Sequence, residues 1–172
     1  IVLFLGALNI YFFFLSIGVH PPFFRFFGKY TLGWSYASFT PAKIGEFSLM
    51  YFLKKYTTYG QSLAVLLLDK IISFFVFGFL SVLGLLWLVD SKIAFVVSIF
   101  LVATSFLILF SFSSQLRTFV KKYLLRKHAE KFLFFHQTFL RLLRDQKLVL
   151  LLNALITFLK LLLQGFLVYV LF

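Results

Sequence analysis

Residues 38–56 read SFTPAKIGEFSLMYFLKKY and interrupt a chain that is otherwise dominated by Leu, Phe, Ile and Val. Pro41, Lys43, Gly45 and Glu46 fall within six consecutive positions of this stretch. Proline cannot continue a preceding helix because it lacks the backbone N–H. Charged side chains in apolar surroundings are costly unless they are paired. The stretch therefore marks a break in a helical chain and a candidate polar site.

The composition around this break indicates an integral membrane protein. Of 172 residues, 62% are hydrophobic and 13% are charged, with a mean hydropathy of +1.03. Soluble domains are nearer half apolar and a quarter charged. The apolar runs reach the ~20 residues that span a bilayer. They recur along the whole chain, which argues against a signal peptide. The absence of Cys excludes disulfides and thiol chemistry.

We expect an all-α fold, a polytopic transmembrane helix bundle forming one transmembrane domain over residues 1–172. Because the chain starts at Ile1 and ends at Phe172 inside an apolar run, we expect it to be part of a longer protein. Apolar length and the Pro, Gly and charged boundaries predict membrane spans at about residues 1–19, 62–89, 93–112 and 148–172.

Residues 30–53 are more polar than these spans and contain Gly33, Pro41 and Gly45. A full crossing would put Arg25 and Lys29 outside, against the usual bias of basic residues toward the cytoplasm. We favour a re-entrant pair of short helices. Irregular backbone at membrane depth needs protein or a water-filled cavity around it, so this segment should face the interior of the molecule.

The net charge of +12 is concentrated between the apolar segments. That pattern is typical of cytoplasmic loops rather than of nucleic-acid binding. We therefore expect a multi-pass protein of the plasma membrane with residues 54–61 and 113–147 in the cytoplasm. The second of these loops is also amphipathic, with Arg141 and Arg144 on other faces than the apolar residues that recur at helical spacing: Phe132, Phe135, Phe139, Leu142 and Leu143. It suits a helix on an anionic leaflet, and an ordinary cytoplasmic hairpin is an equal alternative.

The break itself reads as a helix start, with Thr40 as the cap and Pro41 in the first turn. Lys43 and Glu46 are three residues apart and so share a face, while Gly45 permits the close approach of a backbone or ligand. A helix N-terminus and a lysine together could hold an anionic head group. The alternative is that Lys43 and Glu46 neutralise each other near the interface.

Two further polar placements lie within predicted spans. Asp69 and Lys70 are seven and eight residues into the third apolar helix, about 10–12 Å along its axis. We expect Asp69 to face the interior and Lys70 to reach back to the interface.

The last span carries a stripe at spacings of four, three and four residues, which should face inward: Asn153, Thr157, Lys160 and Gln164. Lys160 is near the middle of the span, where a charge normally faces a partner or a cavity. Asp69 and Glu46 are its candidate partners. The alternative is an inter-helix hydrogen-bonding seam.

Other chemistry is not indicated. His20, His128 and His136 have no metal-ligand spacing, and the five acidic residues are scattered. There is no nucleophile elbow, phosphate loop or dinucleotide fingerprint. We expect no enzymatic activity, no metal and no cofactor.

The segment TPAKIGEFSLMYFLKKY…SLAVLLLDKIISFF resembles the transmembrane region of the lysylphosphatidylglycerol synthase family, a group of flippase-like membrane proteins. The family carries a Pro-x-Arg/Lys-x-Gly-Glu motif followed about twenty residues later by an acidic–basic pair. The matching positions are Pro41, Lys43, Gly45, Glu46, Asp69 and Lys70. The chain has Leu49 where the family often has Arg, and Ser73 where it often has an acid.

The resemblance implies translocation of the head groups of phospholipids or polyprenyl-phosphate-linked lipids. Its implied partners are membrane lipids with anionic head groups, and no nucleic acid. The head-group site would comprise Thr40, Pro41, Lys43, Gly45, Glu46, Asp69, Lys70 and Lys160. The alternative function is a non-transporting subunit or regulator of a lipid-modification or glycosylation enzyme. In that case the basic amphipathic section, with Phe135 and Phe139, docks an envelope enzyme. A second copy of the chain is a further candidate partner.

Overall fold

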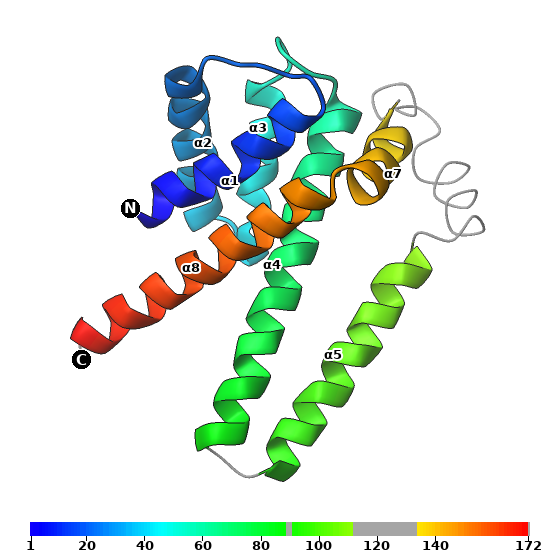
Figure 1. The fold of residues 1–172 in the computed structure, drawn as a ribbon. Coiled ribbons are helices and arrows are strands. Elements are labelled where there is room, and N and C mark those ends of the chain that lie inside the picture. Colours follow the sequence, from blue (N-terminus) through cyan, green and yellow to red (C-terminus); the bar gives the residue numbers. More distant parts are fainter. Residues whose placement is uncertain (89–90, 112–133, 172) are drawn as a thin grey trace. The chain divides into compact units, whose positions relative to one another are not determined.

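The computed structural model describes residues 1–88, 91–111 and 134–171, with the side chains at 42–44 and at a few positions in and beside α5 left outside the description (Figure 1). Every regular element in these ranges is helical, as predicted. In order they are α1 (Val2–Ser16), α2 (Phe23–Ser38), the 3₁₀ helix η1 (Pro41–Phe47), α3 (Ser48–Phe52), α4 (Tyr59–Leu88), α5 (Ser91–Ser111), α7 (Phe135–Asp145) and α8 (Lys147–Leu171).

The chain forms two compact units, of which the first combines Ile1–Ser73 with Lys131–Phe172. The second unit, Phe74–Glu130, contains the later part of α4 and all of α5. All the polar residues that concern the candidate site lie in the first unit. The description below therefore stays within that unit.

Two described helices are long and apolar enough to cross a bilayer, namely α4 over Tyr59–Trp87 and α8 over Lys147–Leu171. Their 29 and 25 residues extend roughly 44 and 37 Å, beyond the ~30 Å of a hydrocarbon core. Few residues of α8 are buried inside the protein, as expected of a helix that faces lipid. The helices at the predicted spans 1–19 and 93–112 form, but α1 has 15 residues and the apolar part of α5, Phe95–Thr104, is also short.

The segment predicted to be a re-entrant pair of helices folds as a hairpin. Helix α2 runs in one direction, and η1 and α3 return along it. At the open end, Lys29 Nζ donates a hydrogen bond to the Phe52 carbonyl oxygen at 2.5 Å. Midway, Gly33 faces Ser48 and Leu49. A hairpin of this kind brings both of its ends to the same side, which a re-entrant segment requires; its insertion in the membrane stays a prediction.

Gly45 lies at the tip of the hairpin, where η1 packs closely against the backbone of α2. A Cβ at this position would come within 2.5 Å of the Ala37 nitrogen and of the Tyr36 carbonyl carbon, so no side chain fits there. The predicted close approach of a backbone is confirmed. Thr40 is extended and η1 begins at Pro41, as predicted.

The prediction that the Thr40 side chain caps η1 is wrong, because Thr40 makes no side-chain capping hydrogen bond there. The Thr40 hydroxyl accepts a hydrogen bond from the Gly45 N–H at 2.8 Å, rather than from the first turn of the helix. The reason is the packing of η1 against the end of α2, which brings Gly45 back over Thr40. Thr40 therefore stabilises the hairpin tip as a whole.

Helix α4 begins at a capping box that the sequence analysis did not identify. The Thr58 N–H donates to Gln61 Oε1 at 3.2 Å, and the Gln61 N–H donates to the Thr58 hydroxyl at 3.3 Å. Reciprocal bonds of this kind satisfy two backbone donors that the first turn of a helix leaves free. The capping box sets the residue at which α4 starts and therefore where Asp69 falls along the helix.

The core of the first unit is made by α1, which packs on both α2 and α8. Gly6 of α1 lies directly beneath the Tyr30 ring of α2, so a methyl group there would meet the tyrosine hydroxyl. Phe14 of α1 and Phe26 of α2 are both buried, with ring centroids 5.8 Å apart. In a membrane, helices associate through such close packing and through polar contacts rather than through the hydrophobic effect.

Candidate functional site

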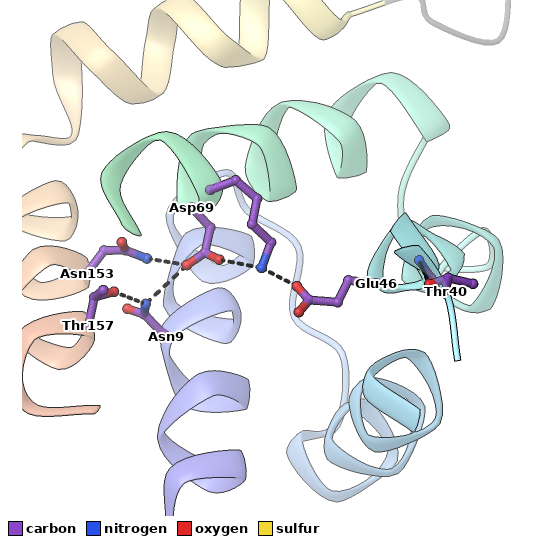
Figure 2. Close-up of polar contacts among 8 residues, drawn as sticks. Asn9, Thr40, Glu46, Asp69, Asn153 and Thr157 are labelled. Atoms are coloured by element: carbon purple, nitrogen blue, oxygen red, sulfur yellow. Dashed lines mark hydrogen bonds and ion pairs between the residues drawn. The ribbon is translucent and has the colours of Figure 1, made fainter. Parts of the chain in front are cut away.

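The carboxylate of Asp69 is the centre of a polar cluster inside the first unit (Figure 2). Its side chain projects from α4 and is 3% exposed. Oδ1 accepts hydrogen bonds from Asn9 Nδ2 of α1 at 3.1 Å and from Asn153 Nδ2 of α8 at 3.0 Å. A carboxylate can only accept, so both amides must turn their NH₂ groups toward it. The prediction that Asp69 faces the interior is confirmed.

A second bond extends this cluster along α8. Asn9 Nδ2 also donates to the Thr157 hydroxyl at 3.1 Å. Asn153 and Thr157 are one turn apart, and each is 1% exposed. These side chains tie α1, α4 and α8 together. They confirm the first half of the predicted polar stripe.

The second half of the predicted stripe is less buried than the first half. Lys160 is half-buried, and its predicted pairing with an acid stays a prediction. Gln164 is exposed, so the prediction that it faces inward is wrong. The reason is that α1 covers only the first part of α8, and no described segment packs over its last turns.

Lys70 joins the Asp69 cluster to the hairpin. Its Nζ forms an ion pair with Glu46 of η1 and lies 3.6 Å from Asp69 Oδ2. The Lys70 side chain is 37% exposed, and that of Glu46 is 9% exposed. The prediction that Lys70 reaches back to the interface is wrong, because two carboxylates within the unit bind its ammonium group. Glu46 lies on the side of Asp69 away from Asn153 (Figure 2).

The partner of Glu46 differs from those that the sequence suggested. Glu46 pairs with Lys70 of α4, whereas the sequence analysis named Lys43 and Lys160 as its candidate partners. The side chain of Lys43 lies outside the described residues, so its predicted sharing of a face with Glu46 stays a prediction. Leu49, at the position where the family often has Arg, is 1% exposed and part of the core.

Several buried acceptors of this region are not used within the described residues. Asn9 Oδ1 and Asn153 Oδ1 have no hydrogen-bond partner there, and neither do the hydroxyls of Ser48, Ser62 and Ser73. Buried polar groups without partners are rare in proteins and call for an explanation. The cluster therefore keeps hydrogen-bonding capacity beyond the contacts that it makes with itself.

A narrow cleft leads to Glu46. It has about 180 Å³ of empty space. Its lining comes from α1, the hairpin and α4: Ile10, Tyr30, Gly33, Trp34, Glu46, Leu49 and Leu66.

The sequence analysis missed Asn9 and Tyr30 as members of this region. Asn9 is the one carboxamide of α1, in the run FLGALNIYFFF. An amide in an apolar helix is expected to bond across helices, and this signal was available. Tyr30 gave no such signal, because aromatic residues are common throughout the chain.

Helices of membrane length, a polar hairpin and a charged cluster buried between them define an integral membrane protein with an internal polar site. The sequence matches the family model for the lysylphosphatidylglycerol synthase TM region over residues 1–172, and the chain belongs to that family. The resemblance seen at Pro41–Glu46 and at Asp69–Lys70 is thereby confirmed. No curated protein and no solved structure shows a significant match to the chain.

Proposed function

We propose that this protein moves the head groups of phospholipids or polyprenyl-phosphate-linked lipids across the plasma membrane, with the acyl chains remaining in the bilayer. The head group would contact the charged cluster of Glu46, Asp69 and Lys70. Membership of the lysylphosphatidylglycerol synthase TM region family supports a role in lipid handling. The proposal involves no bond that is made or broken, and so no catalytic residue.

The ion pair between Glu46 and Lys70 is the observation that carries this proposal. A charged side chain in the middle of a membrane helix costs about 2.5–3.5 kcal/mol on insertion scales, and such residues usually serve a function. The hydrogen bonds of the Asn9 and Asn153 amides to Asp69 already join α1, α4 and α8. The ion pair of Lys70 with Glu46 adds two further charges that these hydrogen bonds do not require.

Lys70 is the charged group that an arriving head group would reach first, because it is the most exposed of the three. A phosphate would replace Glu46 as the partner of the ammonium group and leave the charge around Lys70 unchanged. The released Glu46 would then face the cleft, where it would favour head groups that also carry an amine. Such an exchange requires the hairpin to move away from α4.

The orientation of the hairpin follows from its basic residues. Lys29 contacts Phe52 and lies over the Tyr56 ring, so the first half of α2 lies beside the end of α3. Lys54 and Lys55 lie at this same end. By the bias of basic residues, we assign this end to the cytoplasm, and the hairpin tip would then be inside the membrane.

The test is a transport assay with the purified protein in liposomes that contain a fluorescent phospholipid. The fraction of probe accessible to an external quencher reports transfer between leaflets. We expect transfer with the unaltered protein and its loss in Glu46→Gln and Lys70→Gln. Lys43→Ala tests the contribution of the remaining motif residue in the same way.

Gln164→Ala is the matched control, because Gln164 lies on the stripe of α8 but is exposed and outside the cluster. It should transport like the unaltered protein. Normal transfer in both Glu46→Gln and Lys70→Gln, at unchanged amounts of folded protein, would contradict the proposal. Absence of transfer with every form would favour a non-transporting subunit.

One part of that alternative needs correction. The sequence suggests Phe135 and Phe139 as residues that dock an enzyme partner. Phe139 is 3% exposed, and the two rings stack with centroids 5.9 Å apart. Polar replacements there would disturb the fold rather than a docking surface. The exposed apolar residues of α7 are Leu140 and Leu143.

A further inference from the structure

Helix α7 is held at the edge of the membrane by its connection to α8. It ends at Asp145, and α8 begins at Lys147 after the single residue Gln146. Because α8 is a membrane-length helix, its first residues lie at one surface of the bilayer. With one intervening residue, the two helix ends are at most about 7 Å apart, so the end of α7 must lie close to the same level. Figure 1 shows α7 at an angle to α8 rather than in line with it.

One side of α7 is attached to the protein. Thr138, Phe139 and Leu142 are buried, and the helix packs on α8. The opposite side is exposed, and it has an apolar flank and a basic flank. At about 100° per residue, Leu140 and Leu143 occupy one flank of this exposed side.

The other flank of the exposed side is basic. Arg144, Arg141 and Gln137 lie there at the same helical spacing. Lys147 follows directly at the start of α8, and Asp145 is the one acid in the described residues 134–148. An apolar flank beside a basic flank, along a helix at the bilayer surface, is the arrangement of helices that bind anionic lipids.

Two further basic residues of the first unit, Lys54 and Lys55, lie at the same end of the unit as α7. Asp69 is ten residues into α4 and meets Asn153, six residues into α8. The first residues of α4 and α8 are therefore about 15 and 9 Å along their helices from the cluster. Both helices begin at the same end of the unit (Figure 1). Lys54 and Lys55 precede the start of α4, so they share this end with Arg141 and Arg144.

We propose that α7 lies in the head-group layer of one leaflet and binds anionic phospholipids. Leu140 and Leu143, 49% and 42% exposed, enter the acyl region. Arg141 and Arg144 contact lipid phosphates. The observation that carries this inference is the juxtaposition of these two flanks at the membrane end of α8. It is independent of lipid translocation, because none of these residues belongs to the charged cluster.

The experiment uses the natural absence of Cys, which allows one label per molecule. Leu143→Cys and its control Gln137→Cys are labelled with an environment-sensitive fluorophore in nanodiscs. The discs contain phosphatidylcholine alone or mixed with phosphatidylglycerol. We expect a lipid-attached quencher to reach the label at 143, more so with phosphatidylglycerol, and iodide in the water to reach the label at 137.

The arginines are tested in the same assay. Each basic residue near an anionic surface changes the docking equilibrium about five-fold. Arg141→Gln with Arg144→Gln should therefore move the label at 143 toward water by roughly 25-fold in that equilibrium constant. Replacement of both by Lys should preserve the effect of phosphatidylglycerol.

Two results would overturn the inference. Equal access of iodide to both labels in every disc would show that α7 lies in water. Protection of the label at 143 from both quenchers, whatever the lipid, would show that another protein surface covers it. Both substitutions are at exposed positions, and an unchanged unfolding midpoint of the variants will verify that the fold is intact.

Discussion

Replacing Lys70 with Met should destabilise the protein more than replacing Lys70 and Glu46 together. Lys70 is the cation shared by the carboxylates of Glu46 and Asp69. Methionine keeps the length of the side chain but leaves both acids without a counter-charge. Glu46→Gln in the same molecule removes one of these two charges, and Asp69 keeps its bonds to Asn9 and Asn153.

The expected size follows from burial. Removal of one partner from a fully buried ion pair costs about 3–5 kcal/mol, whereas exposed pairs contribute about 0–1 kcal/mol. Because the Lys70 side chain is 37% exposed, we expect about 2 kcal/mol for Lys70→Met. Glu46→Gln alone should cost about 1 kcal/mol, since Lys70 keeps Asp69. The double variant should cost about 1.5 kcal/mol rather than their sum of about 3 kcal/mol.

Trp34 offers a reporter for this measurement, because it lines the cleft next to Glu46. The second tryptophan, Trp87, is 91% exposed and can be replaced by Phe to leave a single signal. The free energy of unfolding would be measured by titrating the purified protein from mild detergent into SDS. All four proteins of the cycle would be compared in this background.

Additive losses of stability in the Lys70→Met and Glu46→Gln variants would refute this prediction. If the double variant lost as much stability as the two single variants combined, Lys70 and Glu46 would not be energetically coupled. The hairpin would then be held against α4 by apolar packing alone. A coupling of about 1–2 kcal/mol is the result that the geometry requires.

Three further predictions use the same unfolding assay. Asn153→Leu should cost about 1 kcal/mol, because it removes an interhelical hydrogen bond to Asp69, whereas Gln164→Leu on the exposed end of the same stripe should be neutral. Gly45→Ala should cost about 1–3 kcal/mol through overlap with the backbone of α2, whereas Gly28→Ala, in open space on the same hairpin, should be neutral or stabilising by up to ~1 kcal/mol. Thr58→Ala should cost about 1 kcal/mol by removing the capping box of α4, and a cost that Thr58→Ser fails to reduce would contradict that assignment.

The cluster combines two kinds of contact with different consequences. The amides of Asn9 and Asn153 are fully buried and join α1, α4 and α8 around Asp69. The contact between Lys70 and Glu46 joins α4 to the hairpin and is partly exposed. If a segment of this unit moves during lipid handling, we expect it to be the hairpin. A ligand could replace Glu46 as the partner of Lys70 and so release the hairpin from α4.

Much of the fold was predictable because it depends on local properties of the chain. Apolar length predicts helices in a membrane, and Thr40-Pro41 predicts where η1 begins. The glycine that precedes Glu46 in the motif predicts the close approach at Gly45. A carboxylate well inside an apolar helix must face other protein, as Asp69 does.

The sequence by itself determined that this is a helical membrane protein with a break that opens at Thr40-Pro41 and an inward Asp69. Only the tertiary structure decided the partners of the charged residues. Periodicity gives the face of one helix, but the contacts of Asp69 and Asn9 join residues 60, 84 and 148 positions apart. Such pairings depend on how whole helices pack, which is why Lys70 turned to Glu46 and Gln164 stayed exposed.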